Sequence, residues 1–516
     1  MKKFININLI NNIVKFISIN TFAIIFLLMI FIDTKTQYKY ANNLKIENIK
    51  ILGIIFLIFL GLKLIKKILS KFNIENIIQK ILSKSNLIIG TIFVILIIIQ
   101  IIILKNVYFE TTWDVEHMMD TAINFGKTGV FENNEYYDKY QYFSVYPNNL
   151  FLAKIFSIIA RILNNFNKID YTYKICDLIG IILVDLSGII MVKTIANITE
   201  NKIYKIIGAI VFFCFIGLSP WFLVPYSDTY SIIFPIFILY NYTKQNKKIY
   251  NYILIGLFSY IGYLIKPTTV IVVIAISIVE LYKIFIKLIN KKNIELVKII
   301  YIILGIIIAI LLNFGLNRIV TYNVNKQTSL TMYHYLMMGL NPETIGTYSS
   351  EDVLNSLKIY KFEKRISFNK HKIRERANLL DFKKFREFYT KKILINYNDG
   401  TFAWGREGGF FEKENDIDNN LAKKLKSFYY LNGDSYKIFV SIMQTIWLTL
   451  ILFTLIKAIF EKFTYKDSVM YLSIIGLTIF TLLFEARARY LYTYSTFYII
   501  LAVTIIKFPV SCKSKI

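Results

Sequence analysis

Three carboxylates in the first part of the chain lie where a general base could act. Asp114, Glu116 and Asp120 follow closely on segment 87–104, which is apolar and carries no charge. A carboxylate at an apolar boundary is partly desolvated, which favours its protonated form and suits it to take a proton from an attacking hydroxyl. These residues are therefore candidate catalytic bases. An ordinary acidic loop that meets water has the same composition, so this alternative stays open.

Residues suited to phosphate binding lie near the other end of the chain. Glu485, Arg487, Arg489 and Tyr490 occupy a short turn between two apolar segments. The planar guanidinium group binds phosphate in a bidentate manner, so two arginines at a membrane boundary suit a lipid phosphate. Anchoring of the turn at the interface is the alternative explanation.

Two further charged residues each lie between apolar segments with almost no polar spacer. These are Asp228 and Lys266. An ion in such surroundings is costly unless it has a partner or a function. Lys266 could therefore pair with Asp228, or it could bind a phosphate.

Aromatic residues mark additional candidate contacts to a substrate. Tyr146 precedes Pro147 at the start of an apolar segment, where aromatic residues of the membrane interface are common. Trp404 and Arg406 belong to the glycine- and aromatic-rich stretch 398–411. Flat rings and glycine turns could line a sugar site, and a plain surface turn would have the same composition.

The segments that must position these residues are long and apolar. Of the 516 residues, 55% are hydrophobic, in runs long enough to cross a bilayer core of about 30 Å as helices. The pattern predicts an all-α polytopic protein of the cell membrane with twelve or thirteen transmembrane helices. Segment 150–163, which carries Lys154 and Arg161, is predicted to lie along the interface or to enter the membrane only partly. The clearest spans are 13–32, 49–65, 87–104, 175–195, 206–223, 230–242, 252–265, 270–285, 297–316, 438–459, 469–484 and 490–506.

The net charge of +27 does not indicate a nucleic-acid partner in such a chain. Lysine and arginine mark the cytoplasmic ends of membrane helices, and the lysines of the short loops place 105–147, 321–436 and the turn 485–489 outside. The three cysteines and three histidines predict neither a disulfide framework nor a multi-histidine metal centre. No cofactor is expected, and the lipid bilayer is an expected partner.

Four regions follow from the distribution of apolar and polar residues. Residues 1–85 hold two N-terminal transmembrane helices, and residues 86–320 form a transmembrane core whose first external loop is 105–147. Residues 321–436 are extracytoplasmic, and residues 437–516 form the C-terminal transmembrane helices. Within the extracytoplasmic region, the spacing over 362–395 predicts short amphipathic helices packed on the membrane part.

The order of these motifs resembles that of the GT-C glycosyltransferases, multi-helix membrane enzymes that use polyprenyl-phosphate sugars. The motifs are Trp113-Asp114, Tyr146-Pro147, Ser219-Pro220 with Asp228, and a Glu-x-x-x-Arg-Tyr-Leu sequence over 485–491. Stretches 333–342 and 399–404 are similar to those of poorly characterised Gram-positive membrane glycosyltransferases. The resemblance extends, more distantly, to the protein mannosyltransferase and aminoarabinose transferase families. It covers most of the chain from about residue 87 onward, whereas the first two helices look like an addition.

The resemblance implies an inverting transfer of a sugar from undecaprenyl phosphate at the extracytoplasmic face, without a metal. Asp114 would be the base, and Arg487 and Arg489 would hold the donor phosphate. Because Val115 separates Asp114 from Glu116, where relatives have adjacent acids, a share of the role for Glu116 or Asp120 stays open. The acceptor would be an envelope polymer, a glycolipid or a protein. The other substrate-binding residues would be Tyr146, Asp228, Lys266, His334, Trp404, Arg406, Glu485 and Tyr490.

Two other functions fit parts of the pattern. A polysaccharide polymerase or ligase shares the large external region and the arginines. A lipid-linked sugar transporter is the second alternative, but it favours charges in the middle of helices and repeated halves. Charges such as Asp177, Asp185 and Glu280 are few, and no internal repeat is evident.

Overall fold

The protein is an all-α membrane protein in the computed structural model, which describes residues 8–32, 47–69, 75–131, 135–136, 140–291, 297–405 and 413–505. It is 79% helical, so the predicted fold class is confirmed. The strands in these ranges have two residues each and form two antiparallel pairs. β1 (Phe109–Glu110) pairs with β4 (Lys413–Glu414), and β2 (Glu135–Tyr136) pairs with β3 (Tyr140–Gln141).

Seven helical segments among the described residues are long and apolar enough to cross a membrane. Two shorter apolar helices accompany them, within α2 (Asn48–Leu69) and in α12 (Ile249–Ile265). Together they match nine of the predicted spans and support a multi-pass membrane protein. The seven are α1 (Leu9–Phe31), α4 (Ser85–Val107), η2 with α8 (Ile169–Tyr171 and Thr172–Ile198), η5 with α13 (Pro267–Val270 and Ile271–Ile289), α14 (Val297–Ile319), α20 (Tyr436–Phe460) and α21 (Tyr465–Leu483).

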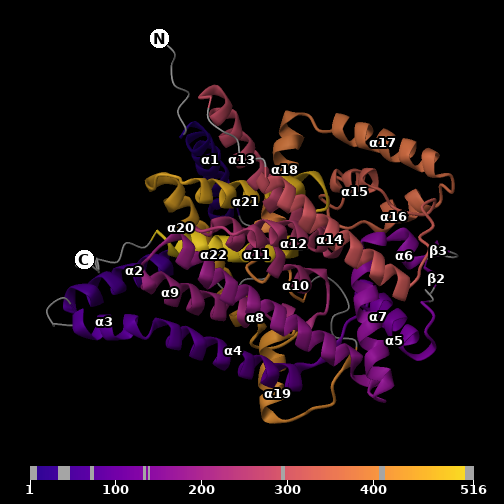
Figure 1. Ribbon diagram of the computed structural model, residues 1–516, viewed down its shortest axis with the longest axis horizontal. Helices are drawn as coiled ribbons and strands as arrows, with labels where there is room; N and C mark the ends of the chain where they lie inside the picture. Colours follow the sequence, from indigo (N-terminus) through magenta and orange to yellow (C-terminus); the bar gives the residue numbers. More distant parts are fainter. Residues whose placement is uncertain are drawn as a thin grey trace.

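The other three predicted spans are short or interrupted helices. Segment 206–223 is divided among α9 (Lys202–Phe212), the π-helical turn η3 (Phe213–Gly217) and η4 (Pro220–Leu223). Segments 230–242 and 490–506 form α10 (Ser227–Ser231) with α11 (Ile233–Thr243), and η6 (Ala488–Tyr494) with α22 (Ser495–Val503). All nine residues of α22 are buried, and Figure 1 shows α22 and α11 near the centre of the molecule. Irregular backbone is tolerated at membrane depth when protein surrounds it.

The predicted extracytoplasmic region forms small helices, and some of them contact the long ones. The helices predicted over 362–395 are present as α17 (Phe362–Asn378) and α18 (Phe382–Tyr397), but the predicted apolar face is largely unpacked. Leu379 is 52% exposed and Phe385 50%, and the buried residues of α17 are Arg365 and Asn369. α18 contacts α1, α21 and η6, whereas α17 contacts α15 and α16. The other helices of this region are α15 (Met332–Gly339), α16 (Ser350–Leu357) and α19 (Asn420–Tyr429).

The loop after α4 also folds into short helices, which Figure 1 places at one end of the molecule. They are α5 (Asp114–Thr128), α6 (Tyr142–Val145), η1 (Pro147–Asn149) and α7 (Leu150–Asn165), while α3 (Glu75–Ser83) precedes α4. α7 packs along α5 and is not one of the seven spans. Its cations have protein partners, since Lys154 donates to Asn317 at 2.7 Å and Arg161 donates to the Gly126 carbonyl at 3.1 Å. That α7 lies along the interface stays a prediction.

Two glycines allow α12 and α14 to cross with their backbones in contact. A Cβ atom at Gly256 would overlap the carbonyl oxygen of Ile302, and one at Gly305 would overlap that of Ile253. Small residues permit this close approach between membrane helices, where packing rather than water exclusion drives association. The crossing holds α14 against α12 just before the chain enters region 321–436, which is predicted to be extracytoplasmic.

Gly305→Ala is expected to lower the free energy of unfolding by about 1–3 kcal/mol, because the added methyl group forces the two backbones apart. Thermal unfolding of the detergent-solubilised protein measures this change. Gly315→Ala on the same helix is the control, since no atom lies within 4 Å of the position that a Cβ would take there and alanine favours helix. Equal midpoints for the two variants would contradict the proposed role of the crossing.

Candidate functional site

Two buried tyrosines hold the carboxylate of Asp114 at the start of α5. The Tyr142 hydroxyl donates to Oδ1, and the Tyr226 hydroxyl donates to Oδ2 at 2.7 Å. Burial raises the pKa of both phenols well above the ordinary value, so they stay protonated donors. The Tyr142 hydroxyl accepts a hydrogen bond from Asn149 in turn. Each carboxylate oxygen has about two acceptor positions, so Asp114 retains capacity for an incoming hydroxyl.

An unusual backbone conformation brings the chain into α5. Trp113 has φ 58° and ψ −138°, a conformation that non-glycine residues adopt at a cost and that occurs mainly where the surroundings impose it. Its indole meets the Tyr226 ring edge-on at 4.9 Å between centroids. One turn further along α5, His117 stacks on Tyr142 at 4.4 Å. Aromatic rings thus fix both tyrosines that bind Asp114.

Asp228 forms the buried ionic centre beside this carboxylate. Lys266, at the joint between α12 and η5, donates to its Oδ1 atom. Arg489 of η6 lies with Nε 3.7 Å from its Oδ2 atom. All three side chains are at least nine-tenths buried. Of the two roles left open for Lys266, the structure shows the pairing with Asp228.

Arg489 connects this ionic centre to Asp114. Its guanidinium carbon lies 5.0 Å from the Trp113 ring centroid and 5.1 Å from that of Tyr226, a cation–π arrangement. The same Tyr226 side chain therefore contacts Arg489 through its ring and Asp114 through its hydroxyl.

The turn between α21 and η6 supplies the second arginine. Arg487 pairs with Glu485 through an Nε–Oε1 distance of 2.5 Å, and the Tyr490 hydroxyl donates to the other carboxylate oxygen at 3.2 Å. The Arg487 side chain is 16% exposed, more than that of Arg489 at 6%. Arg487, Tyr490 and Asp114 are half-buried and are therefore the members of the group most open to an incoming molecule.

The structure brings together residues from four distant parts of the chain. We call the group the Asp114 cluster. Its sequence-predicted members include three acids and three cations, so their formal charges balance before any ligand binds. Tyr146 lies beside it, with its ring 5.4 Å from that of Tyr142. The cluster consists of Asp114, Tyr142, Tyr226, Asp228, Lys266, Glu485, Arg487, Arg489 and Tyr490.

The other two predicted bases, Glu116 and Asp120, lie outside this cluster. Glu116 lies 4.0 Å from Lys413, and the Asp120 side chain is exposed to solvent. Both follow Asp114 on α5, but only Asp114 occupies the helix start that faces Tyr142 and Tyr226. Arg406 lies outside the described residues.

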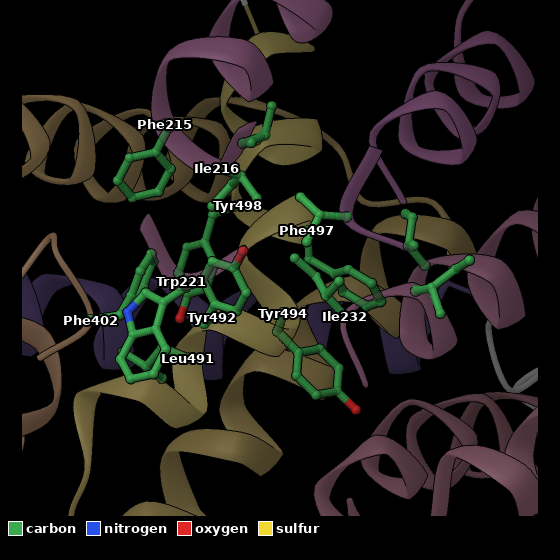
Figure 2. Close-up of a cluster of buried hydrophobic side chains, with 14 of the residues drawn as sticks. Phe215, Ile216, Trp221, Ile232, Phe402, Leu491, Tyr492, Tyr494, Phe497 and Tyr498 are labelled. Carbon is green, nitrogen blue, oxygen red and sulfur yellow. The ribbon is translucent and has the colours of Figure 1, made fainter. Parts of the chain in front are cut away.

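Trp404 belongs to the aromatic core and not to the Asp114 cluster. It is fully buried, donates its indole N–H to the Tyr429 carbonyl at 2.7 Å, and packs edge-on against Trp221. Figure 2 shows Trp221 together with Phe402 and Tyr492 in this core. Its buried ring and its hydrogen-bonded indole N–H give Trp404 a packing function.

His334 is also separate from the cluster. It is buried in α15, its Nδ1 atom lies 2.9 Å from the Ser356 hydroxyl of α16, and that hydroxyl donates to Asn369 of α17. Burial lowers its pKa to about 4, so the ring is neutral at neutral pH. The contact joins three small helices of the predicted extracytoplasmic region.

Lys392 is a positioning residue that no sequence motif revealed. Its ammonium group donates to the carbonyls of Gly339, Leu482 and Phe484 at 2.6, 2.7 and 2.6 Å. All three of its hydrogens are therefore used. α18 in this way fixes the end of α21, immediately before Glu485, against the end of α15. The backbone of Ala486 adds a hydrogen bond to Gly346 at 2.7 Å.

The fold and this cluster define a polytopic membrane protein with a buried charged site at the ends of its helices. The chain belongs to the family described as conserved hypothetical integral membrane protein, whose model matches residues 7–510. No curated protein and no solved structure matches the chain. Among the described residues, no three His, Cys, Asp or Glu side chains are grouped to hold a metal ion.

Lys392→Met is expected to loosen the turn that carries Glu485 and Arg487. It leaves the buried Gly339 carbonyl without its donor, at a cost of about 1–3 kcal/mol, and removes the donor from the partly buried carbonyls of Leu482 and Phe484. Hydrogen exchange read by mass spectrometry should show faster exchange over 339–346 and 482–487. Lys383→Met, at an exposed position of the same helix, is the control. Unchanged exchange in the Lys392 variant would exclude the positioning role.

The stability of the protein should depend on pH through Glu485. Burial raises the pKa of this carboxyl from 4.5 to about 7, although Arg489 and Tyr490 oppose the shift. Between these values the folded state holds a proton that the unfolded state has released, so stability falls as pH rises. Glu485→Gln removes this contribution.

Thermal midpoints measured from about pH 5 to about pH 8 should therefore fall more steeply for the wild type than for Glu485→Gln. Glu351→Gln, at an exposed acid of α16, should follow the wild type. Parallel curves for the wild type and the Glu485 variant would contradict the raised pKa.

Proposed function

We propose that the protein is a glycosyltransferase of the GT-C type that transfers a sugar from a polyprenyl-phosphate donor to a hydroxyl acceptor outside the cell membrane. One observation carries most of this proposal. The Asp114 carboxylate accepts a hydrogen bond from the Tyr226 hydroxyl, and the Arg489 guanidinium lies over the ring of the same side chain. A candidate base and a candidate phosphate ligand, far apart in the sequence, thus share one site.

The chemistry requires a base on one side of the anomeric carbon and cations on the other. The acceptor oxygen attacks that carbon, and its proton passes to Asp114. The bond between the anomeric carbon and the phosphate oxygen breaks, and polyprenyl phosphate leaves with the bonding electrons. Attack from the face opposite the leaving group inverts the anomeric centre. Arg487 and Arg489 stabilise the negative charge that the phosphate gains.

The tyrosines and the second acid pair have supporting functions. Tyr142 and Tyr226 orient the Asp114 carboxylate through one hydrogen bond to each oxygen. Asp228 fixes Lys266 and Arg489, and Glu485 fixes Arg487, so the cations are held before the donor arrives. Preorganised charges of this kind stabilise a transition state without reorganisation during the reaction.

The location of the cluster supports access by a lipid donor. The cluster lies beside the ends of apolar helices, close to where α4 gives way to β1, where α12 meets η5 and where α21 ends. The positive-inside rule places this side of the membrane outside, because the lysine-rich short loops lie at the other ends of α11, α13 and α21. A prenyl chain could remain in the outer leaflet while its phosphate reaches Arg487.

Asp114→Asn is expected to reduce sugar transfer by about 10²–10⁴-fold, the usual contribution of a general base. The measurement is the transfer of radiolabelled sugar from polyprenyl monophosphate to a cell-envelope extract by the protein in lipid nanodiscs. Asp170→Asn is the control, because Asp170 is an exposed acid on the same side of the membrane in η2.

Three outcomes would contradict this assignment. A folded Asp114→Asn protein with full transfer excludes the proposed base. Transfer only from a diphosphate-linked oligosaccharide indicates a polymerase or ligase. Movement of the lipid-linked sugar between leaflets without transfer indicates a transporter.

A further inference from the structure

A cavity of about 560 Å³ lies at the opposite end of the bundle from the Asp114 cluster. α21 begins at this cavity with Tyr465 and ends at Leu483 beside Glu485, which separates the two sites by roughly 28 Å at 1.5 Å per residue. Six lysines and two acids line the cavity. They are Lys244, Lys247, Lys283, Lys457, Lys462, Lys466, Glu461 and Asp467.

The lining lysines come from separate segments that the fold brings together. They belong to the loop after α11, to α13, to the end of α20 and the loop after it, and to the start of α21. Burial and the neighbouring Lys283, Lys298 and Lys466 lower the pKa of Lys247, against the effect of Glu280. Like charges gathered in this way repel one another, and a bound anion would relieve the repulsion.

Some of these lysines have acidic partners, whereas others rest on aromatic rings. Lys457 lies 3.3 Å from Asp467, and Lys283 lies 2.6 Å from Glu280. Lys244 lies over the Tyr240 ring and Lys247 over the Tyr242 ring, at 4.6 and 4.7 Å from the centroids. A ring face satisfies only one side of an ammonium group, so its hydrogens can still bind an anion.

The start of α21 does not supply the anion site by itself. Thr464 and Asp467 form a capping box there, which satisfies the backbone amides of these two residues. The lysines supply the positive side chains of the cavity. The lysines that signal membrane orientation need only lie near the water interface. In this protein six lysines line one cavity together with Tyr204, Tyr242 and Tyr465. The orientation of a membrane protein does not require its lysines to gather in this way.

We propose that this cavity binds a phosphate-bearing anion, either the headgroup of an anionic lipid or a soluble phosphate compound. Its volume lies within the range of about 300–1,000 Å³ typical of small-ligand sites. The lysines supply the charge, and the tyrosines supply flat walls and hydroxyl groups. The site is independent of the Asp114 cluster and of the activity proposed for it.

The test uses the full chain in nanodiscs of neutral phosphatidylcholine, with thermal unfolding as the readout. Inorganic pyrophosphate is the soluble probe, and phosphatidylglycerol mixed into the disc is the lipid probe. The double variant Lys247→Gln and Lys462→Gln is expected to require at least about tenfold more of the effective probe for the same stabilisation. Substitution of the same two residues by arginine should retain the response.

The control removes the same charge from the same side of the membrane outside the cavity. Lys202→Gln with Lys287→Gln serves this purpose, because Lys202 starts α9 and Lys287 lies in the last turn of α13. Neither residue lines the cavity. Loss of the response only in the cavity variant supports the proposal.

The two probes then identify the source of the phosphate. A saturable response to pyrophosphate in neutral discs indicates a soluble ligand, and a response confined to phosphatidylglycerol indicates a lipid headgroup. The proposal is overturned if neither probe stabilises the wild type. It is also overturned if the cavity variant and the control variant lose the response equally.

Discussion

The arrangement of the site depends on one buried carboxylate, Asp228, held between Lys266 and Arg489. These residues join α10, the joint of α12 with η5, and η6, which are short or interrupted helices surrounded by protein. Removing one partner from such a group typically costs about 3–5 kcal/mol, because a buried charge loses its compensation. Arg489 then packs on Trp113 and Tyr226, and Tyr226 orients Asp114. The orientation of Asp114 therefore depends on the ion pair of Asp228 with Arg489, to which it is linked through Tyr226.

The sequence predicts the long helices well and the interrupted ones poorly. α4, α14 and α20 are long apolar runs whose length alone predicts a span, and α8 is long and apolar enough to do so despite Asp177 and Asp185. α22 has nine residues and is fully buried by its neighbours, a condition that depends on segments far away in the chain. Charged residues of the Asp114 cluster were predictable because charges between apolar segments are rare. Tyr142 and Tyr226 were not, since the chain has 37 tyrosines, and Lys392 is one of 61 basic residues.

The loop around Trp404 shows why an aromatic motif alone does not define a binding site. Rings and glycines suit a sugar surface and a packed core equally, and the sequence could not separate these alternatives. Hydrogen bonds from other helices determine that this loop packs into the core. Gln444 of α20 accepts from Gly400 at 2.7 Å and donates to Asn398, which Asn48 of α2 also contacts at 2.6 Å. Amides from two membrane helices thus hold the loop inward, and the core receives its rings.

The same amides have a consequence for the biogenesis of the protein. Asn48 and Gln444 are bonded across 396 positions, and Asn11 of α1 accepts from Ser468 across 457. A ribosome releases the first two helices into the bilayer long before α20 and α21 exist. During that interval Asn48 can already donate to the Met29 carbonyl of α1 at 2.7 Å, but its bond to Gln444 must wait. The final packing of the first two helices therefore forms only after the last pair is made.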